Sequence, residues 1–243
     1  DLDGQAFTGF RRDDSVNDKI TLDINSNKEG VYTFKVIPAD KTGLLGKETY
    51  IRITVDNTPP SAALSINGGA AYVNSPEVTL NISAQDNLAG AEKMRIRNYG
   101  EAFGEAVPYA ASYKWSLGSG DGEKTVFVTV IDKAGNESKE SSAAIMLDTT
   151  PPAPPAVEGI EPSVMRNGEY YTSHKSITIK GRKEAGASVY INGKEVVPLD
   201  AKEAFRCEYE LADNEKAVTT LNQLNIYSSD AAGNTSKQEQ VSI

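Results

Sequence analysis

Cysteine and histidine are almost absent, with one of each in 243 residues. A single cysteine cannot form a disulfide within the chain, so Cys207 says nothing about the redox compartment. Nor is there a cluster of Cys and His of the kind that holds zinc. Cys207 and His174 fall in different expected strand regions, and nothing marks a nucleophile or base beside either of them. We therefore expect a surface-loop histidine and no catalytic site.

Positive charge is also scarce. Lys and Arg number 25 against 34 Asp and Glu, which gives a net charge of −9. A nucleic acid needs a basic face on its protein partner, and this balance does not supply one. No apolar run approaches the roughly 20 residues that span a bilayer. We therefore expect no nucleic-acid partner and no membrane insertion in this segment.

Helical periodicity is missing as well. Apolar and polar residues instead alternate over short segments, as they do in half-buried strands, and turn-forming clusters such as NGG, QDNLAG, GSGDG and DKAGN separate these segments. Six or seven short strands with such punctuation favour a two-sheet β-sandwich. The clearest strands are expected at residues 63–66, 78–83, 93–98, 113–117, 125–131 and 143–147.

One motif occurs twice in full and once cut short. It is an apolar strand, an Asp-x-x-Gly turn, and a second strand that ends in Asp-x-Thr-Pro-Pro. The turn residues Asp40 and Asp132 are 92 residues apart (132 − 40), and so are Asp56 and Asp148 before the prolines (148 − 56). A fixed period of this size indicates a tandem array of small domains.

The period predicts three segments. Residues 1–59 are the C-terminal part of one sandwich, and residues 60–150 and 151–243 are two further sandwich domains. The stretch PPAPPA opens the third segment and is a semi-rigid spacer, because proline fixes φ. Within that segment, Asn192-Gly193 predicts a tight hairpin turn.

The first segment is an incomplete domain by this alignment. Subtracting the period from residue 93 gives residue 1, so the counterparts of residues 61–92, including the strand VTLNIS, are missing. The apolar face of Phe34 and Val36 would then be open, beside an unpaired strand edge. The missing strands precede Asp1, come from a partner chain, or are replaced by the polar N-terminal segment. We expect the first.

The segments TPPSAALSINGGAAYVNSPEVTLNISAQD, YKWSLGSGDGEKTVFVTVIDKAGN and IMLDTTPP resemble bacterial immunoglobulin-like repeats. KSITIKGRKEAGASVYINGKEV and YSSDAAGN resemble a second subtype of that group. The resemblance covers essentially the whole chain and implies an all-β fold of tandem immunoglobulin-like β-sandwiches, in an extracellular or cell-surface setting. The first segment departs from the pattern where Leu44 replaces the asparagine of Asn136 and Asn234, so we expect its turn to be held differently.

The resemblance also bears on function. Such repeats act as spacers, adhesive stalks or accessory modules beside catalytic domains. We expect a non-catalytic structural spacer or adhesive stalk of a secreted or surface-attached bacterial protein, which positions neighbouring domains of the same chain. A protein or glycan of a host or of the environment is a further candidate partner. The alternative is a glycan-binding accessory module of an extracellular carbohydrate-active enzyme, and an enzyme fragment is the third reading.

Three aromatic residues, Tyr109, Tyr113 and Trp115, are the candidate glycan ligands. Tyr113 and Trp115 share a face if their segment is a strand, and two exposed rings could stack on sugars. The alternative is that Trp115 fills the core, because burying an indole removes much apolar area from water. We favour the core. Its expected inward-facing partners are Leu80, Ile82, Val126, Val128 and Val130.

Two sets of carboxylates are candidate calcium ligands, because the linker and two loops of an immunoglobulin-like sandwich meet at one pole. Calcium takes six to eight oxygens, which converging carboxylates and carbonyls can supply. The alternative is that each aspartate accepts backbone N–H groups of its own turn, and we favour it. The sets are Asp56, Asp86 and Asp132 for the second segment, and Asp148, Glu184 and Asp230 for the third.

Overall fold

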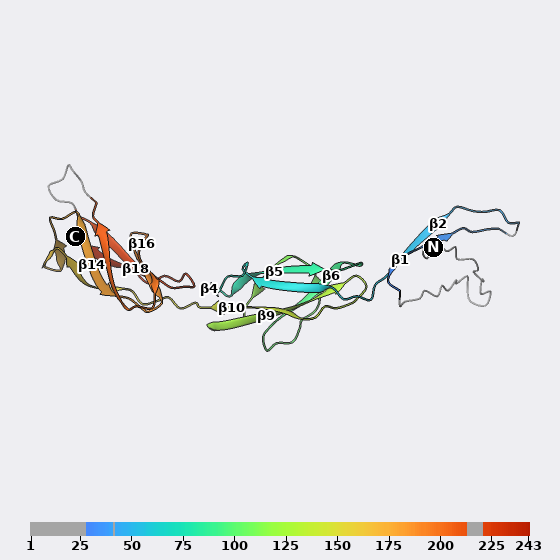
Figure 1. Cartoon of the computed structure of the whole chain (residues 1–243), viewed down its shortest axis with the longest axis horizontal. Helices are drawn as coiled ribbons and strands as arrows, with labels where there is room; N and C mark the ends of the chain where they lie inside the picture. Colours follow the sequence, from blue (N-terminus) through green and yellow to red (C-terminus); the bar gives the residue numbers. More distant parts are fainter. Residues whose placement is uncertain (1–27, 41, 213–220) are drawn as a thin grey trace. The chain divides into compact units, whose positions relative to one another are not determined.

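The computed structural model describes residues 28–40, 42–212 and 221–243, which form strands and loops (Figure 1). Two further segments that the sequence favours as short strands, residues 5–8 and 20–24, lie outside the described residues. The described residues include no helix with the length and apolarity for a membrane crossing. The chain packs into two compact units, one of Asp1–Gly68, Thr79–Lys114 and Thr125–Ala143, the other of Gly69–Val78, Trp115–Lys124 and Ala144–Ile243.

The first described element is a two-stranded antiparallel hairpin of β1 (Gly30–Val36) and β2 (Thr49–Val55). Its register pairs Phe34 with Ile51, so the two apolar side chains share a face. Phe34 is buried, as the alternation predicts, whereas Ile51 is 44% exposed. Residues 1–27 lie outside the described residues, so the expectation of upstream strands stays a prediction.

The middle segment forms two sheets. One contains β3 (Ser61–Ile66), β5 (Glu77–Gln85) and β8 (Ser112–Ser116), in that order. The other runs β4 (Tyr72–Val73), β10 (Ser141–Leu147), β9 (Gly122–Asp132), β6 (Ala91–Asn98) and β7 (Val107–Pro108). All six strands expected here are present, and only the two-residue strands β4 and β7 were not expected.

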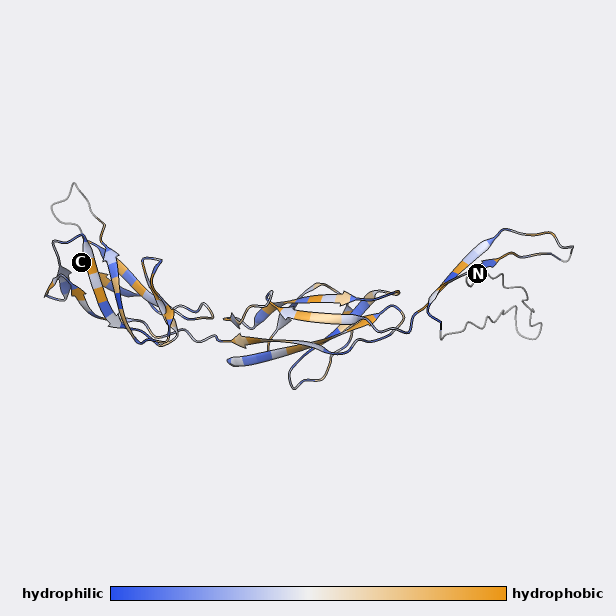
Figure 2. Cartoon of the chain, viewed as in Figure 1, coloured by the Kyte–Doolittle hydropathy of each residue, from blue (hydrophilic) through white to orange (hydrophobic). Residues whose placement is uncertain are grey.

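Alternation places the expected side chains inside. Along β9, Val126, Val128 and Val130 are each 0% exposed, and Leu80 and Ile82 of β5 are buried as well. Figure 2 shows the resulting alternation of hydrophobic and hydrophilic residues along the strands. Trp115 lies on the inward side of β8 together with Tyr113, as predicted, but its side chain is only half-buried. It lies on β8, an edge strand of its sheet, which has a neighbour on one side only.

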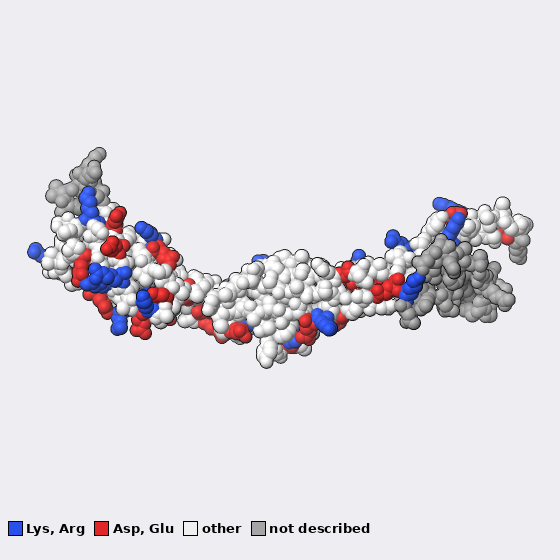
Figure 3. Space-filling view, in the orientation of Figure 1, with Lys and Arg blue, Asp and Glu red and all other residues white. Residues whose placement is uncertain are grey.

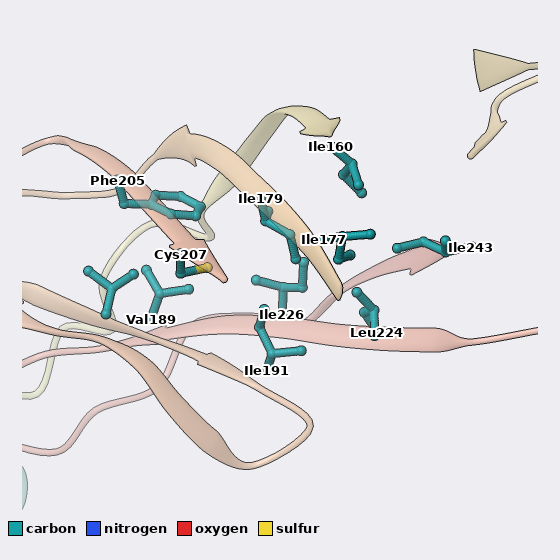
Figure 4. Packing of buried hydrophobic residues seen from close by; sticks show 11 residues of the cluster. Ile160, Ile177, Ile179, Val189, Ile191, Phe205, Cys207, Leu224, Ile226 and Ile243 are labelled. Carbon is teal, nitrogen blue, oxygen red and sulfur yellow. The ribbon is translucent and has the colours of Figure 1, made fainter. Parts of the chain in front are cut away.

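The third segment repeats this plan. Its sheets are β11 (Ala156–Glu161), β14 (Ser176–Arg182), β17 (Ala204–Glu210), and β16 (Lys194–Asp200), β15 (Ala187–Ile191), β18 (Gln223–Ser229), β19 (Glu239–Ser242). The small hairpin of β12 (Val164–Arg166) and β13 (Glu169–Tyr171) is additional. Buried residues of both sheets, among them Ile179, Ile226 and Cys207, form one cluster (Figure 4). The turn between β15 and β16 has φ of 49° at Asn192 and 81° at Gly193, which confirms the predicted hairpin.

The strand order establishes the fold class. Leaving out β4, β12 and β13, each sandwich places its first, second and fifth strands in one sheet and its fourth, third, sixth and seventh in the other. Immunoglobulin-like sandwiches likewise build each sheet from strands that are not consecutive in the chain, although their constant type places the fourth strand with the first, second and fifth, whereas here it pairs with the third. The expected all-β fold of tandem sandwiches is confirmed.

Candidate functional site: the linkers and their anchors

Two linkers follow the last strands of the first and middle segments. We call residues 56–60 the first linker and residues 148–155 the second. In each, the leading aspartate accepts the amide N–H of the threonine two residues later through Oδ1, at 3.0 Å from Thr58 and at 3.0 Å from Thr150. Such a turn fixes the chain at the point where it leaves the strand. The second proline of each Thr-Pro-Pro is buried.

A carboxylate of the preceding segment anchors each linker. Glu29 Oε1 accepts the N–H of Asn57 at 2.8 Å and the hydroxyl of Thr58 at 2.7 Å. Asp121 Oδ1 accepts the N–H of Thr149 at 2.9 Å, and its Oδ2 accepts the hydroxyl of Thr150 at 2.7 Å. Glu29 and Asp121 are 92 residues apart (121 − 29), so the anchor follows the repeat.

These hydrogen bonds favour the charged form of both carboxyl groups. The hydroxyl of Thr58, followed by the N–H of Asn57, lowers the pKa of Glu29. The hydroxyl of Thr150, followed by the N–H of Thr149, lowers the pKa of Asp121. Both anchors are therefore ionised at neutral pH, when they hold the linkers.

An asparagine of the following segment forms the second anchor. Asn136 Nδ2 donates to the backbone oxygen of Asp56 at 3.0 Å. Asn234 Nδ2 donates to the backbone oxygen of Asp148 at 2.8 Å. Each amide also donates to the aspartate that begins its own turn, Asp132 or Asp230, at 2.9 Å. Both hydrogens of each amide are thus used, one to hold the side chain and one to hold the linker.

The turn sequence Asp-x-Ala-Gly-Asn explains how the asparagine is aimed. Asp132 Oδ1 accepts the N–H groups of Ala134 and Asn136 at 2.8 and 2.9 Å. Gly135 supplies a φ of 95°, which residues with a Cβ rarely adopt. Two residues on, the Ser138 hydroxyl accepts the N–H of Val130 at 3.0 Å and ties the turn back to β9.

The turn between β1 and β2 has the same backbone hydrogen bond but no side chain that could anchor a linker. Asp40 N–H donates to the Leu44 carbonyl at 3.0 Å, as Asp132 N–H does to the Asn136 carbonyl. Leu44 is 73% exposed and has no polar group for a linker. Here Asp40 Oδ1 accepts the Thr42 hydroxyl at 2.6 Å. The expectation that this turn is held differently is confirmed for the side chains, while the backbone frame is the same.

The first carboxylate set meets as expected. Ligand atoms of Asp56, Asp86 and Asp132 all lie within 4.8 Å of one another. Each side chain also accepts backbone N–H groups, and Asp56 Oδ2 takes that of Ala89 at 2.8 Å. The N–H of Gly90, at 2.7 Å from Oδ2, is the main cause of the lowered pKa of Asp86. Asp86 Oδ1 is buried and has no hydrogen-bond partner among the described residues. The alternative reading of hydrogen-bonded turns describes these contacts, and calcium binding stays a prediction.

The second set does not form a comparable group within the part of the chain that the structure describes. Asp148 and Asp230 serve the linker and the turn, as above. Glu184 Oε2 accepts the N–H of Ala153 in the second linker at 2.8 Å. Next to it, the buried ammonium group of Lys183 lies 2.8 Å from Asp200 Oδ1. To form a calcium site, Asp148, Glu184 and Asp230 would have to give up their present hydrogen-bond partners.

The three aromatic residues that were candidates for glycan binding are half-buried. Lys114 Nζ contacts Thr79 Oγ1 at 2.8 Å, and Thr79 faces outward because its neighbours in β5 are buried. Tyr113 and Trp115 flank Lys114 in β8 and so lie on the opposite, inner face, half-buried. Tyr109 donates its hydroxyl to the Ile82 carbonyl at 3.0 Å. Sugar binding at these residues stays a prediction that this placement does not favour.

A different aromatic group escaped the sequence reading. Arg97 and Phe127 are cross-strand partners of β6 and β9, and Tyr99 and Phe103 follow β6. Alternation along MRIRN could have placed Arg97 on the outer face, but nothing local indicated which rings it meets.

The lone histidine lies in a surface loop, as expected, and the lone cysteine lies in a strand. Cys207 lies in the core beside its strand partner Ile179, and burial raises the pKa of its thiol. His174 is exposed in the loop between β13 and β14.

No protein-family model matches the chain, and no curated protein matches it. Among solved structures, fibronectin(III)-like modules of Clostridium thermocellum CbhA match at 12% identity and a TM-score of 0.48, over 74% of this chain and 92% of that one. The central fibronectin-III array of RIM-binding protein matches at 13% and 0.29, over 93% and 78%. Streptomyces avermitilis α-L-rhamnosidase, complexed with L-rhamnose, matches at 9% and 0.29, over 75% of this chain and 24% of its own. The likenesses concern the fold alone.

Proposed function

We propose that this chain is a non-catalytic structural spacer whose linkers are fastened at both ends, so that it holds its neighbouring domains at a set reach and angle. The observation that carries the proposal is the pair of linker anchors repeated at a 92-residue interval, Glu29 and Asp121. In the first and middle segments, a carboxylate binds the linker where it leaves the segment. A freely flexible joint would not require such a contact.

The asparagine anchors support the same proposal. Asn136 and Asn234 each tie the carbonyl that ends one segment to a turn of the next. Prolines restrict φ along the rest of each linker, and the N–H of Ala153 is held by Glu184. Solvent screens the hydrogen bonds to the carboxylates of Glu29 and Asp121, so each contributes little by itself and several per linker are needed for a stiff joint.

The proposal includes a setting and partners. Tandem sandwiches that resemble bacterial immunoglobulin-like repeats suit a secreted or surface-attached protein, and the partners are neighbouring domains of the same chain. An adhesive role at the end of such a stalk would add a protein or glycan of the environment.

Distances between spin labels test the stiffness of the second linker. Labels at Lys93→Cys and Glu195→Cys, both exposed strand positions, should give one narrow distance distribution in the otherwise native chain. Asn234→Leu, which copies Leu44, should broaden it. Asn136→Leu is the matched control, because it removes the anchor of the other linker and should leave this distance unchanged. A broad distribution in the native chain would refute the proposal.

A glycan-binding accessory module remains the second candidate. The specific observation that favours it is the exposed ring of Tyr99 on the middle sandwich.

A further inference from the structure

Four side chains form a stack on the outer face of the sheet that contains β6 and β9. The guanidinium carbon of Arg97 lies 3.9 Å from the centre of the Phe127 ring and 5.0 Å from that of Phe103. The Tyr99 ring lies 6.5 Å from Phe127, with 30° between the two planes. Arg97 Nη2 is also 2.9 Å from Glu140 Oε2. The cation is thus held by two rings and a carboxylate, and it fixes the ring on which Tyr99 packs.

Tyr99 has an exposed side chain on a backbone that is held in place. Its side chain is 78% exposed. Its N–H donates to the Thr125 carbonyl at 2.9 Å, and Gly100, with a φ of 79°, turns the chain immediately after it. The fixed backbone and the contact with Phe127 reduce the conformational entropy that Tyr99 loses when a ligand stacks on its ring.

We propose that Tyr99 is the stacking platform of a binding site for a neutral saccharide. The axial C–H groups of a pyranose carry partial positive charge and suit the negative face of an aromatic ring. Two polar side chains nearby could bind sugar hydroxyls: Glu101 lies in the turn two residues after Tyr99, and Glu140, just before β10, is hydrogen-bonded to Arg97. This site is separate from the linkers, so it goes beyond the spacer function.

The surroundings favour a sugar over a protein partner. A stable protein interface buries roughly 800 Å² on each side and has an apolar centre. Here the other two rings, Phe103 and Phe127, are half-buried beneath Arg97, and a single exposed ring is flanked by charged side chains. One ring with a polar rim matches the size of one or two sugar residues.

The charge selects a neutral glycan. The net charge of the chain is −9, and on the face shown in Figure 3 basic side chains are scattered among acidic ones. Arg97 offsets the charge of Glu140, and Glu101, two residues after Tyr99, adds one negative charge that no ion pair offsets among the described residues. Uronic-acid or sulfated polysaccharides would therefore be repelled, since like charges disfavour association.

Affinity electrophoresis tests the proposal directly. The native chain is run through non-denaturing gels that contain mixed-linkage β-glucan, xylan or galactomannan, with polygalacturonate as the acidic comparison. At least one neutral polysaccharide should retard it, and polygalacturonate should not. Tyr99→Ala should weaken the retardation by about tenfold or more in apparent affinity, and Tyr99→Trp should preserve it.

The matched control is Tyr171→Ala, which removes a tyrosine that is 50% exposed on another sandwich. It should leave the retardation unchanged. Thermal unfolding of Tyr99→Ala should match that of the native chain, since the side chain is exposed. No retardation in any neutral gel, retardation that survives Tyr99→Ala, or equal retardation by polygalacturonate would each overturn the proposal. None of these results would affect the spacer function, which the label distances test.

Discussion

Asn136, Asn234 and Leu44 occupy the same position in three turns that share one backbone frame. The carboxylate of the leading aspartate and the glycine build the turn in all three cases, so the side chain at the fifth position can vary without loss of the turn. An amide at this position reaches the linker, and a leucine cannot. A single residue therefore sets whether a sandwich pole can receive an incoming chain.

Two buried serines should respond in opposite ways to loss of the hydroxyl. Ser228 is 0% exposed, and its Oγ has no partner among the described residues. Ser236 Oγ accepts the N–H of Ser228 and donates to the Lys237 carbonyl. We expect Ser228→Ala to stabilise the third sandwich by about 1 kcal/mol and Ser236→Ala to destabilise it by about 1–3 kcal/mol. Urea unfolding measures both, and a loss of stability in Ser228→Ala would contradict the expectation.

Calcium titration separates the two readings of the Asp56, Asp86 and Asp132 cluster. Because backbone N–H groups already bind all three side chains, we expect the same unfolding temperature in millimolar calcium and in chelator. Asp86→Asn should then change stability equally in both solutions. A saturable rise with calcium that Asp86→Asn removes would establish the cluster as a metal site instead.

The alternation of apolar and polar residues was sufficient to predict a strand wherever the strand is long and covered on one face. The run TVFVTVI predicted β9 and its inward valines, because their period of two matches a half-buried strand. β11 was not expected, since AVEGIE follows four prolines and alternates weakly. β4 and β7 have two residues each, too few for any pattern.

The linker contacts show why the rest could not be predicted. The meeting of Asp56, Asp86 and Asp132 followed from the order of loops in the sandwich. The hydrogen bond between Asn136 and Asp56 joins residues 80 apart (136 − 56) and depends on side-chain reach, which no local pattern carries. Trp115 was assigned to the core by its area alone, and the edge position of β8 left it half-covered.

The contact between β11 and β14 gives a test at one glycine. A Cβ at Gly181 would lie against the Ala156 carbonyl oxygen and 2.7 Å from atoms of the Phe205 ring. We expect Gly181→Ala to cost about 1–3 kcal/mol or more, as overpacking does. Gly159→Ala in β11 is the control, because a Cβ there meets nothing within 4 Å. Equal unfolding midpoints for the two variants would mean that these strands are not packed as described.

For the whole chain, acid should loosen the joints before it unfolds the sandwiches. Hydrogen bonds lower the pKa of Glu29 and Asp121. A lowered folded-state pKa adds stability that is present above the ordinary carboxyl value of about 4 and is lost as the pH falls through the folded value. Asp121→Asn should thus speed hydrogen exchange of the Thr149 amide at neutral pH. The difference in exchange rate between this variant and the native chain should become smaller below about pH 4.

The exposed Glu158→Gln serves as the control for that series and should leave Thr149 exchange unchanged at every pH. An effect of Asp121→Asn that stays constant into acid would show that the charge of the carboxylate does not hold the linker.

The proposed spacer function requires that the anchored linkers join the sandwiches into one stiff body. Residual dipolar couplings of backbone amides in residues 61–147 and 156–243 measure this most directly, because each sandwich reports its own alignment in the same sample. We predict that a single alignment tensor fits both sandwiches in the native chain, and that Asn234→Leu splits it into two tensors of different magnitude. Two tensors already present in the native chain would contradict the account.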